Sequence, residues 1–251
     1  MADNRAVAIV TGGGRGIGAA IAKGLARDGY AIAVNYAGNE DAAAKTVSEI
    51  TANGGTALAI QADVAKEDDV IRLFAAVDKS FGAVTALINN AGIGGGLSRL
   101  EDLSAAALAN VFAVNVFGAF LCCREAVRRM STRRGGAGGN IVNISSRAAQ
   151  LGSPGEWVHY AATKCALDTL TVGLAREVAA EEIRVNAVAA GLVETEMHAA
   201  AGEPGRPQRI APTIPMRRAG TAEEIANCVR FLVSPAASYV TAAIVAVSGG
   251  R

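Results

Sequence analysis

Short apolar runs rich in β-branched residues recur along the chain and alternate with segments of helical period. The apolar runs lack a clean in-and-out alternation, which is typical of parallel strands covered on both faces. They predict strands over 7–11, 31–35, 57–61, 86–89, 141–144, 184–188 and 244–247. The helical periods predict helices over 17–28, 41–53, 66–81, 104–129, 160–180 and 221–233. Strand and helix alternate from end to end, so we expect an α/β fold with a doubly wound parallel sheet.

No change of composition and no internal repeat divides the 251 residues, so we expect a single domain over 1–251. One segment, 196–217, holds four prolines and exceeds the usual length of a loop. We interpret 196–217 as a substrate lid, with a mobile surface insertion as the alternative. Residues 247–251 follow the last predicted strand closely, so we expect no extended contact from them.

The composition removes several classes of partner. With 24 basic and 23 acidic side chains, the net charge of +1 argues against nucleic acid or an anionic membrane surface. Four cysteines and two distant histidines suit neither a disulfide framework nor a metal site, so we predict no metal. Segments 104–123 and 231–250 lack charge, but a buried helix and a central strand explain them better than membrane spans. We therefore expect a cytoplasmic protein.

A glycine-rich turn follows the first predicted strand and opens the first predicted helix. Gly12, Gly16 and Gly18 let the backbone turn sharply and approach a ligand closely. The N–H groups at a helix start favour an anion such as a pyrophosphate. A glycine cluster alone can be only a tight turn, but the strand–turn–helix context favours nucleotide binding.

Tyr160 and Lys164 lie four residues apart on a predicted helix, which places them on one face. An ammonium beside the phenol favours the phenolate, so we predict that Lys164 lowers the pKa of Tyr160 toward working pH. Tyr160 could then give or take a proton in carbonyl or alcohol chemistry. Such a pair is common on surfaces; its position after the strand that ends in Ser145-Ser146 favours the catalytic interpretation.

Several motifs occur in an order that resembles the short-chain dehydrogenase/reductase family. The glycine turn has that family's spacing, Gly-x-x-x-Gly-x-Gly after Thr11. The further matches are Asn89-Asn-Ala-Gly92, Asn115-Val-x-Gly118, Ile144-Ser-Ser146, Tyr160-Ala-Ala-Thr-Lys164 and Arg184-Val-Asn186. The resemblance covers almost the whole chain. It implies a Rossmann-like three-layer sandwich, a seven-stranded parallel sheet with helices on both faces, and a nicotinamide cofactor.

The resemblance also implies residue roles. Ser146, rather than its competitor Ser145, would bind the substrate oxygen, and Tyr160 would be the proton donor or acceptor. Lys164 would also hold the nicotinamide ribose, and Asn115 would hold a water of a proton relay. The implied cofactor contacts are Gly12, Arg15, Gly16, Ile17, Gly18, Asn35, Tyr36, Asp63, Val64, Asn90, Ala91, Gly92, Tyr160, Lys164, Gly191 and Thr195. The chain departs from the family in Ala190-Gly191, where Pro-Gly is usual, and in one extra residue between Ser146 and Tyr160.

The end of the second predicted strand indicates which cofactor is used. It reads Asn35-Tyr36-Ala37, without the carboxylate that binds a ribose 2′-hydroxyl in NAD-preferring folds. Arg15 could pair with a 2′-phosphate, so NADP(H) is favoured and NAD(H) stays possible. Arg15 could instead be a solvated loop arginine. Asp63 resembles the family's adenine contact, but it could simply cap the helix that begins near Lys66.

The leading hypothesis is an NADP(H)-dependent oxidoreductase that reduces a ketone or aldehyde, or oxidises the alcohol. It resembles 3-oxoacyl-(acyl carrier protein) reductases and sugar or alcohol dehydrogenases of the family. The alternative is a catalytically silent NADP-binding regulatory protein of the same fold. The uncharged helix around 108–123 has extra apolar surface, and related enzymes pair it across a dimer, so we expect a homotetramer. Substrate identity lies in 150–159 and 196–217, for which the sequence offers no code.

Overall fold

The computed structural model describes residues 6–251, except for the side chain of His198. Seven parallel strands form one sheet in the order β3-β2-β1-β4-β5-β6-β7. The predicted seven-stranded parallel sheet is therefore confirmed. The strands are β1 (Val7–Val10), β2 (Ala31–Tyr36), β3 (Thr56–Gln61), β4 (Ala86–Asn89), β5 (Gly139–Ser146), β6 (Ile183–Ala190) and β7 (Ile244–Val247).

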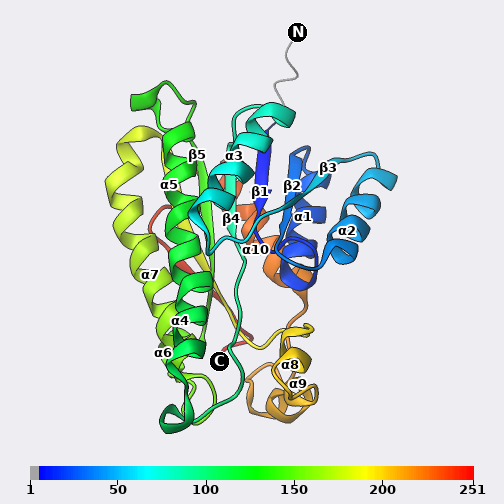
Figure 1. The fold of residues 1–251 in the computed structure, drawn as a ribbon, viewed down its shortest axis with the longest axis vertical. Helices are drawn as coiled ribbons and strands as arrows, with labels where there is room; N and C mark the ends of the chain where they lie inside the picture. The colour runs from blue at the N-terminus through cyan, green and yellow to red at the C-terminus, as the bar shows by residue number, and fades with distance from the viewer. Residues whose placement is uncertain (1–5) are drawn as a thin grey trace.

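Helices cover both faces of the sheet and make the outer layers of the sandwich (Figure 1). One buried apolar cluster joins the sheet to α1, α2 and α10, and a second joins the opposite face to α3, α5 and α7. The helices are α1 (Gly16–Arg27), α2 (Glu40–Ala52), α3 (Glu67–Phe81), α4 (Ala105–Phe112), α5 (Gly118–Met130), α6 (Ala148–Leu151), α7 (Val158–Val178), α8 (Met197–Ala200), α9 (Arg206–Ile210) and α10 (Ala222–Val233).

The helix predicted over 104–129 forms, but a π-helical turn interrupts its α-helical hydrogen bonding. A π-helical turn, Ala113–Phe117, separates α4 from α5 and contains Asn115. An extra residue in a helical turn rotates the side chains that follow it, and such turns are frequent at functional sites. The whole stretch Ala105–Met130 is long and apolar enough to cross a membrane by length and composition alone. In this structure the stretch is part of one helical layer on the sheet, where it packs against α3, α7 and the strands β4 and β5.

The order of the strands reverses between β1 and β4. From β1 the chain continues toward β2 and β3 at one edge of the sheet, and from β4 it continues toward β5, β6 and β7 at the other. At such a switch point the loops after neighbouring strands separate and leave a crevice at the carboxyl edge of the sheet. The segment predicted as a lid lies beyond this edge, where α8 and α9 fold over it (Figure 1). Strand β5 continues two residues further than predicted, because Ser145 and Ser146 still pair with Ala189 and Ala190 of β6.

Candidate active site

A cleft of about 660 Å³ lies at the carboxyl edge of the sheet. The glycine-rich turn and the ends of β2, β4, β5 and β6 line it, together with the start of α7 and residues of the segment 196–217, which the sequence predicts to be a lid. The predicted site residues reach this cleft from distant parts of the sequence. All of them line it except Asn115, which lies behind its wall.

The glycine-rich turn bends where the sequence predicts. Gly12 and Gly16 have φ of 60° and 52°, a left-handed conformation in which residues with a Cβ are strained. A Cβ on Gly18 would lie 2.3 Å from the carbonyl oxygen of Gly12, so no larger residue fits there. Helix α1 then begins at Gly16 without a side-chain cap. The N–H groups of its first turn therefore remain for an anion in the cleft.

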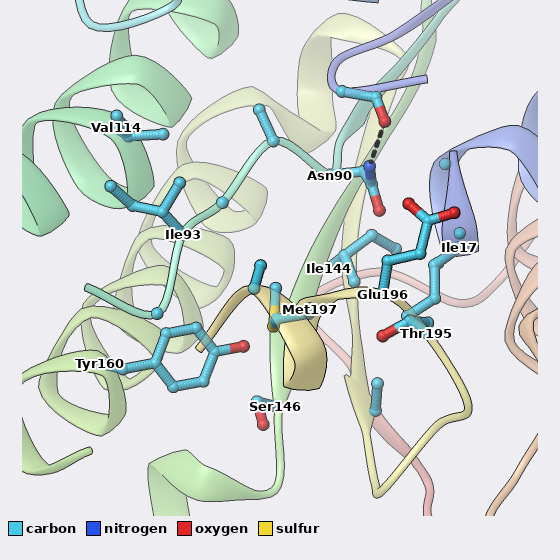
Figure 2. Close-up of a pocket in the computed structure, with 18 of the residues that line it drawn as sticks. Ile17, Asn90, Ile93, Val114, Ile144, Ser146, Tyr160, Thr195, Glu196 and Met197 are labelled. Atoms are coloured by element: carbon cyan, nitrogen blue, oxygen red, sulfur yellow. Dashed lines mark hydrogen bonds between the residues drawn. The ribbon is translucent and has the colours of Figure 1, made fainter. Parts of the chain in front are cut away.

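Two asparagines predicted as cofactor contacts also hold the turn in place. The Asn35 amide accepts from Gly12 N (3.4 Å) and donates to the carbonyl of Ala62 (2.9 Å). The Asn90 amide nitrogen donates to the carbonyls of Thr11 and Gly12 (2.9 and 3.0 Å), as the hydrogen bond drawn in Figure 2 illustrates. Both residues line the cleft, but these side-chain groups are engaged with backbone.

Arg15 and Asp63 lie at the end of the cleft near β2. The Arg15 side chain is 57% exposed, and its Nη1 lies 3.5 Å from Oε2 of Glu196 at the start of the lid. The Asp63 carboxylate accepts from Ala65 N (3.0 Å), whereas the cap position of α3 is Lys66. Asp63 therefore closes the turn before α3 rather than capping the helix itself. No carboxylate lines the cleft between 35 and 39.

Tyr160 projects into the cleft from the first turns of α7, beside Ser146 at the end of β5 (Figure 2). Its side chain is buried, and that burial raises the pKa of Tyr160 to about 12. Hydrogen bonding to Ser146 and the charge of Arg206 lower this pKa. The prediction that Lys164 lowers the pKa of Tyr160 was wrong, because desolvation dominates and the opposing groups are Ser146 and Arg206.

Lys164 lies one helical turn after Tyr160, as the spacing predicts. Its Nζ is 5.4 Å from the centroid of the Tyr160 ring and donates to the carbonyl of Ile144 (2.8 Å). Burial lowers the pKa of Lys164 to about 8, and the carboxylate of Asp168 opposes that shift. A backbone carbonyl of β5 thus holds the Lys164 ammonium at the floor of the cleft, and the lowered pKa brings its loss of a proton nearer to neutral pH.

The two serines at the end of β5 face different surroundings. The Ser145 hydroxyl donates to the backbone carbonyl of Lys164 (3.3 Å) and is buried. The Ser146 hydroxyl accepts from Ala148 N (3.1 Å) and adjoins the phenol of Tyr160. Alternation along the strand therefore turns Ser146, not Ser145, toward the phenol.

Asn115 fastens the segment after β4 to α7. Its amide accepts from Ile93 N (2.8 Å) and donates to the Ile93 carbonyl (2.9 Å) and to Oγ1 of Thr163 (3.0 Å). A Cβ on Gly92 would lie 3.4 Å from Oδ1 of Asn115 and 3.5 Å from Nζ of Lys164. The glycine therefore keeps open the gap between the Asn115 amide and the Lys164 ammonium.

Gly191 and Thr195 lie on the opposite wall of the cleft. A Cβ on Gly191 would come within 2.6 Å of Cα of Ser248, so this turn requires glycine even without the proline usual before it. Thr195 lies beside Gly16, because a Cβ built on Gly16 would be 3.5 Å from Cγ2 of Thr195, a van der Waals contact. The glycine turn and the base of the lid therefore face each other, as Ile17 and Thr195 do in Figure 2.

Two arginines and a tryptophan that belong to none of the sequence motifs also line the cleft. Trp157 lines the cleft and lies 5.8 Å from Tyr160 between ring centroids. Arg206 of α9 stacks over the Trp157 ring at 4.7 Å, and Arg251 also lines the cleft. The sequence predicts no extended contact from 247–251; the structure shows hydrogen bonds there, among them one from Nε of Arg147 to a backbone oxygen of Arg251 (2.6 Å). Neither arginine belongs to a motif, so no sequence signal marked them.

Comparisons with known proteins agree with this geometry. A family model described as enoyl-(acyl carrier protein) reductase matches residues 12–251. An uncharacterized oxidoreductase of Escherichia coli, YgfF, is 52% identical over 98% of this chain and 100% of its own. The 3-oxoacyl-[acyl-carrier-protein] reductase FabG of Staphylococcus epidermidis is 41% identical over 97% of each chain. A short-chain dehydrogenase/reductase structure from Serratia marcescens has a TM-score of 0.89 at 38% identity, covering 98% of this chain and 97% of that one.

Proposed function

Because the chain belongs to the short-chain dehydrogenase/reductase family and is an NAD(P)-dependent oxidoreductase, we propose that it reduces a ketone or aldehyde with NADPH. The observation that carries this proposal is the placement of two hydroxyls, those of Tyr160 and Ser146, beside one another in the cleft. A carbonyl oxygen placed between them would meet a proton donor and a hydrogen-bond donor together.

The residues present suit a dinucleotide. The uncapped start of α1 and the left-handed glycines offer backbone N–H groups to a pyrophosphate, and a Cβ on Gly18 would close the turn. Tyr36, Asp63 and Val64 would border the adenosine, and Gly92, Gly191 and Thr195 would border the nicotinamide. When bound, the cofactor supplies the hydride.

We assign the proton chemistry to four side chains. Tyr160, protonated at neutral pH by its raised pKa, donates its proton to the substrate oxygen during reduction. Ser146 donates a hydrogen bond to the same oxygen, and its hydrogen bonding to Tyr160 favours the phenolate that remains. Asn115 keeps a path beside Gly92 through which a water could return a proton to Lys164. In alcohol oxidation the same groups act in reverse.

The preference for NADP(H) rests on Arg15 and on the missing carboxylate after β2. Arg15 is exposed and lies at the mouth of the cleft, and its partner Glu196 is 68% exposed. An exposed ion pair at 3.5 Å contributes little, so a 2′-phosphate could replace that carboxylate at small cost. A carboxylate at 35–39 would instead have repelled the phosphate.

The names of the similar proteins indicate two classes of substrate. FabG is named as a 3-oxoacyl-[acyl-carrier-protein] reductase, and the family model as an enoyl-(acyl carrier protein) reductase. The paired hydroxyls favour carbonyl over enoyl reduction, because they meet charge developing on an oxygen. We propose a single domain in which 196–217 is the lid over this substrate.

We further propose that the protein is cytoplasmic and assembles as a homotetramer. Phe117 and Phe120 are 62% and 48% exposed where the π-helical turn meets α5, an apolar surface suited to an interface between copies of the chain. Phe117→Asp should reduce the mass measured by sedimentation, and an unchanged mass would reject this surface as an interface.

The proposed activity is tested by supplying ketones, aldehydes, sugars and 3-oxoacyl thioesters with NADPH and, separately, with NADH. Turnover of at least one carbonyl, faster with NADPH, supports the proposal. Tight NADPH binding with no turnover across the panel would favour the silent regulatory protein, which retains the fold without the chemistry. A lack of binding would reject both.

A further inference from the structure

The substrate end of the cleft carries an excess of positive charge that the proposed hydride and proton chemistry does not use. Arg206 and Arg251 both line the cleft, whereas the carboxylates Glu156 and Glu203 beside them do not. Glu156 accepts from Arg206 at 2.5 Å and from Arg209 at 3.0 Å, and Glu203 accepts from Arg209 at 2.6 Å. Glu156 and Glu203 thus pair with Arg206 and Arg209, and no side-chain carboxylate of residues 6–251 forms an ion pair with Arg251.

Arg206 is buried, with 8% of its side chain exposed, although it lies in the lid. The hydrogen bond to Glu156 comes from Nη2, while Nε is buried without a hydrogen-bond acceptor in the described residues and lies 3.8 Å from Glu203. A buried guanidinium that donates so few of its five N–H groups is incompletely satisfied. It therefore favours a further oxygen acceptor near it.

Arg251 is held in place by its backbone, so its side chain stays at the cleft. A backbone oxygen of Arg251 accepts from Nε of Arg147 (2.6 Å) and from Oγ of Ser248 (2.9 Å). Within residues 6–251 its guanidinium forms no ion pair. Burial lowers the pKa of Arg251, and the positive charges of Arg206 and Arg209 lower it further. The carboxylate of Glu156 acts in the opposite direction and raises it. Like charges held together in a partly desolvated site are complementary to an anion.

We propose that Arg206 and Arg251 form an anion site at the substrate end of the cleft, and that the carbonyl substrate carries a carboxylate or phosphate. This inference rests on the proposed function, since it names the class of carbonyl that Tyr160 would reduce. Arg206 adjoins Trp157, which adjoins Tyr160, so the anion would lie a short distance from the reacting carbonyl. Guanidinium groups suit both anions because they can donate two parallel hydrogen bonds.

The turnover test compares substrates that differ only in charge: 3-oxobutanoate against methyl 3-oxobutanoate, and a phosphorylated hydroxyketone against the free hydroxyketone. We expect kcat/KM with NADPH to favour one charged member by about tenfold or more, and the preference to weaken as salt increases. Carboxylate and phosphate are distinguished by which pair shows the preference. Equal kcat/KM within both pairs would overturn the proposal.

Arg251→Gln should remove most of that preference by lowering kcat/KM for the charged member only, and Arg251→Lys should restore part of it. Arg209→Gln is the matched control. Arg209 binds Glu156, as Arg206 does, and also Glu203, but it does not line the cleft. Arg206→Gln should act as Arg251→Gln does, although loss of its Glu156 contact could also disturb the lid. Equal losses for charged and neutral substrates in Arg251→Gln would contradict the anion site.

Binding without turnover separates this inference from the proposed function. Trp157 is the single tryptophan of the chain and stacks on Arg206, so its fluorescence reports this site directly. With NADP⁺ present, which has no hydride to give, 3-oxobutanoate or the phosphorylated ketone should perturb the fluorescence and Arg251→Gln should weaken that binding. Binding without any turnover would sink the reductase proposal alone. Turnover of neutral ketones without anion binding would sink the anion site alone.

Discussion

The two ends of the cleft are built from different parts of the chain. At the cofactor end, backbone makes the site: glycines 12, 16 and 18 shape the turn, and Asn35 and Asn90 hold it by hydrogen bonds to main-chain atoms. At the substrate end, side chains make the site: Tyr160, Arg206 and Arg251 meet from α7, the lid and the segment after β7. A backbone-built site tolerates few substitutions and binds a common group, whereas a side-chain-built site can change its substrate.

The largest effect should come from the side-chain end. Tyr160→Phe keeps the ring beside Trp157 but removes the proton donor, so kcat should fall by about 10²–10⁴-fold. NADPH binding, measured by fluorescence titration, should change little because the glycine turn is untouched. Undiminished kcat would show that Tyr160 is not the proton donor.

The two neighbouring serines provide a matched pair at the same end. Ser146→Ala should lower kcat by about 10²-fold, because the hydrogen bond to the developing oxyanion is lost. Ser145→Ala removes a buried hydrogen bond to the Lys164 carbonyl and should cost mainly stability, about 1 kcal/mol by thermal unfolding. The reverse ranking in kcat would exchange the roles of the two residues.

The opposite signature is expected at the backbone-built end. Gly18→Ala places a Cβ 2.3 Å from the Gly12 carbonyl, so the turn must shift, at a cost of about 1–3 kcal/mol in folding free energy. NADPH binding should be lost along with the turn. Gly173→Ala in α7 is the control, since its Cβ would meet nothing within 4 Å. Normal cofactor affinity in Gly18→Ala would mean that this turn does not bind the dinucleotide.

A smaller effect should separate the two cofactors. Arg15→Ala removes the charge proposed for the 2′-phosphate, so KM for NADPH should rise about tenfold while KM for NADH stays within about twofold. Arg27→Ala, an exposed arginine at the far end of α1, should change neither value. Equal losses for both cofactors would reject the phosphate contact.

The smallest effect concerns pH. If Lys164 must be protonated for reduction, kcat/KM should fall as pH rises through about 8, where burial places its pKa. The Asp168 carboxylate raises the pKa of Lys164, so Asp168→Asn should move that limb to lower pH, by less than about one unit. Asp68→Asn, exposed on α3, serves as the control. If the alkaline decline of kcat/KM moved to higher pH in Asp168→Asn, the assignment of that decline to Lys164 would be contradicted.

The sequence could predict the cofactor end more fully than the substrate end. Strand–turn–helix spacing placed Gly12, Gly16 and Gly18, because their need for positive φ or close approach is a local property. It assigned Asn35 to the cofactor, although its amide is engaged with Gly12 and Ala62, since residue identity does not reveal which acceptor lies nearest. It also misjudged the pKa of Tyr160, because burial depends on packing from α7 and the lid.

By itself the sequence determined the seven strands and the parallel sheet, since the period of apolar residues specifies them, and the resemblance of its motifs to a known family supplied the four residues proposed for proton chemistry. Only the tertiary structure decided that the winding of the long helix is broken at Asn115, that Ser146 faces Tyr160, and that Arg206 and Arg251 share the cleft. Arg206 and Arg251 lie 45 positions apart in the numbering and belong to no motif. Their proximity follows from how the segment 196–217 packs at the carboxyl edge of the sheet, which depends on long-range packing and not on local sequence pattern.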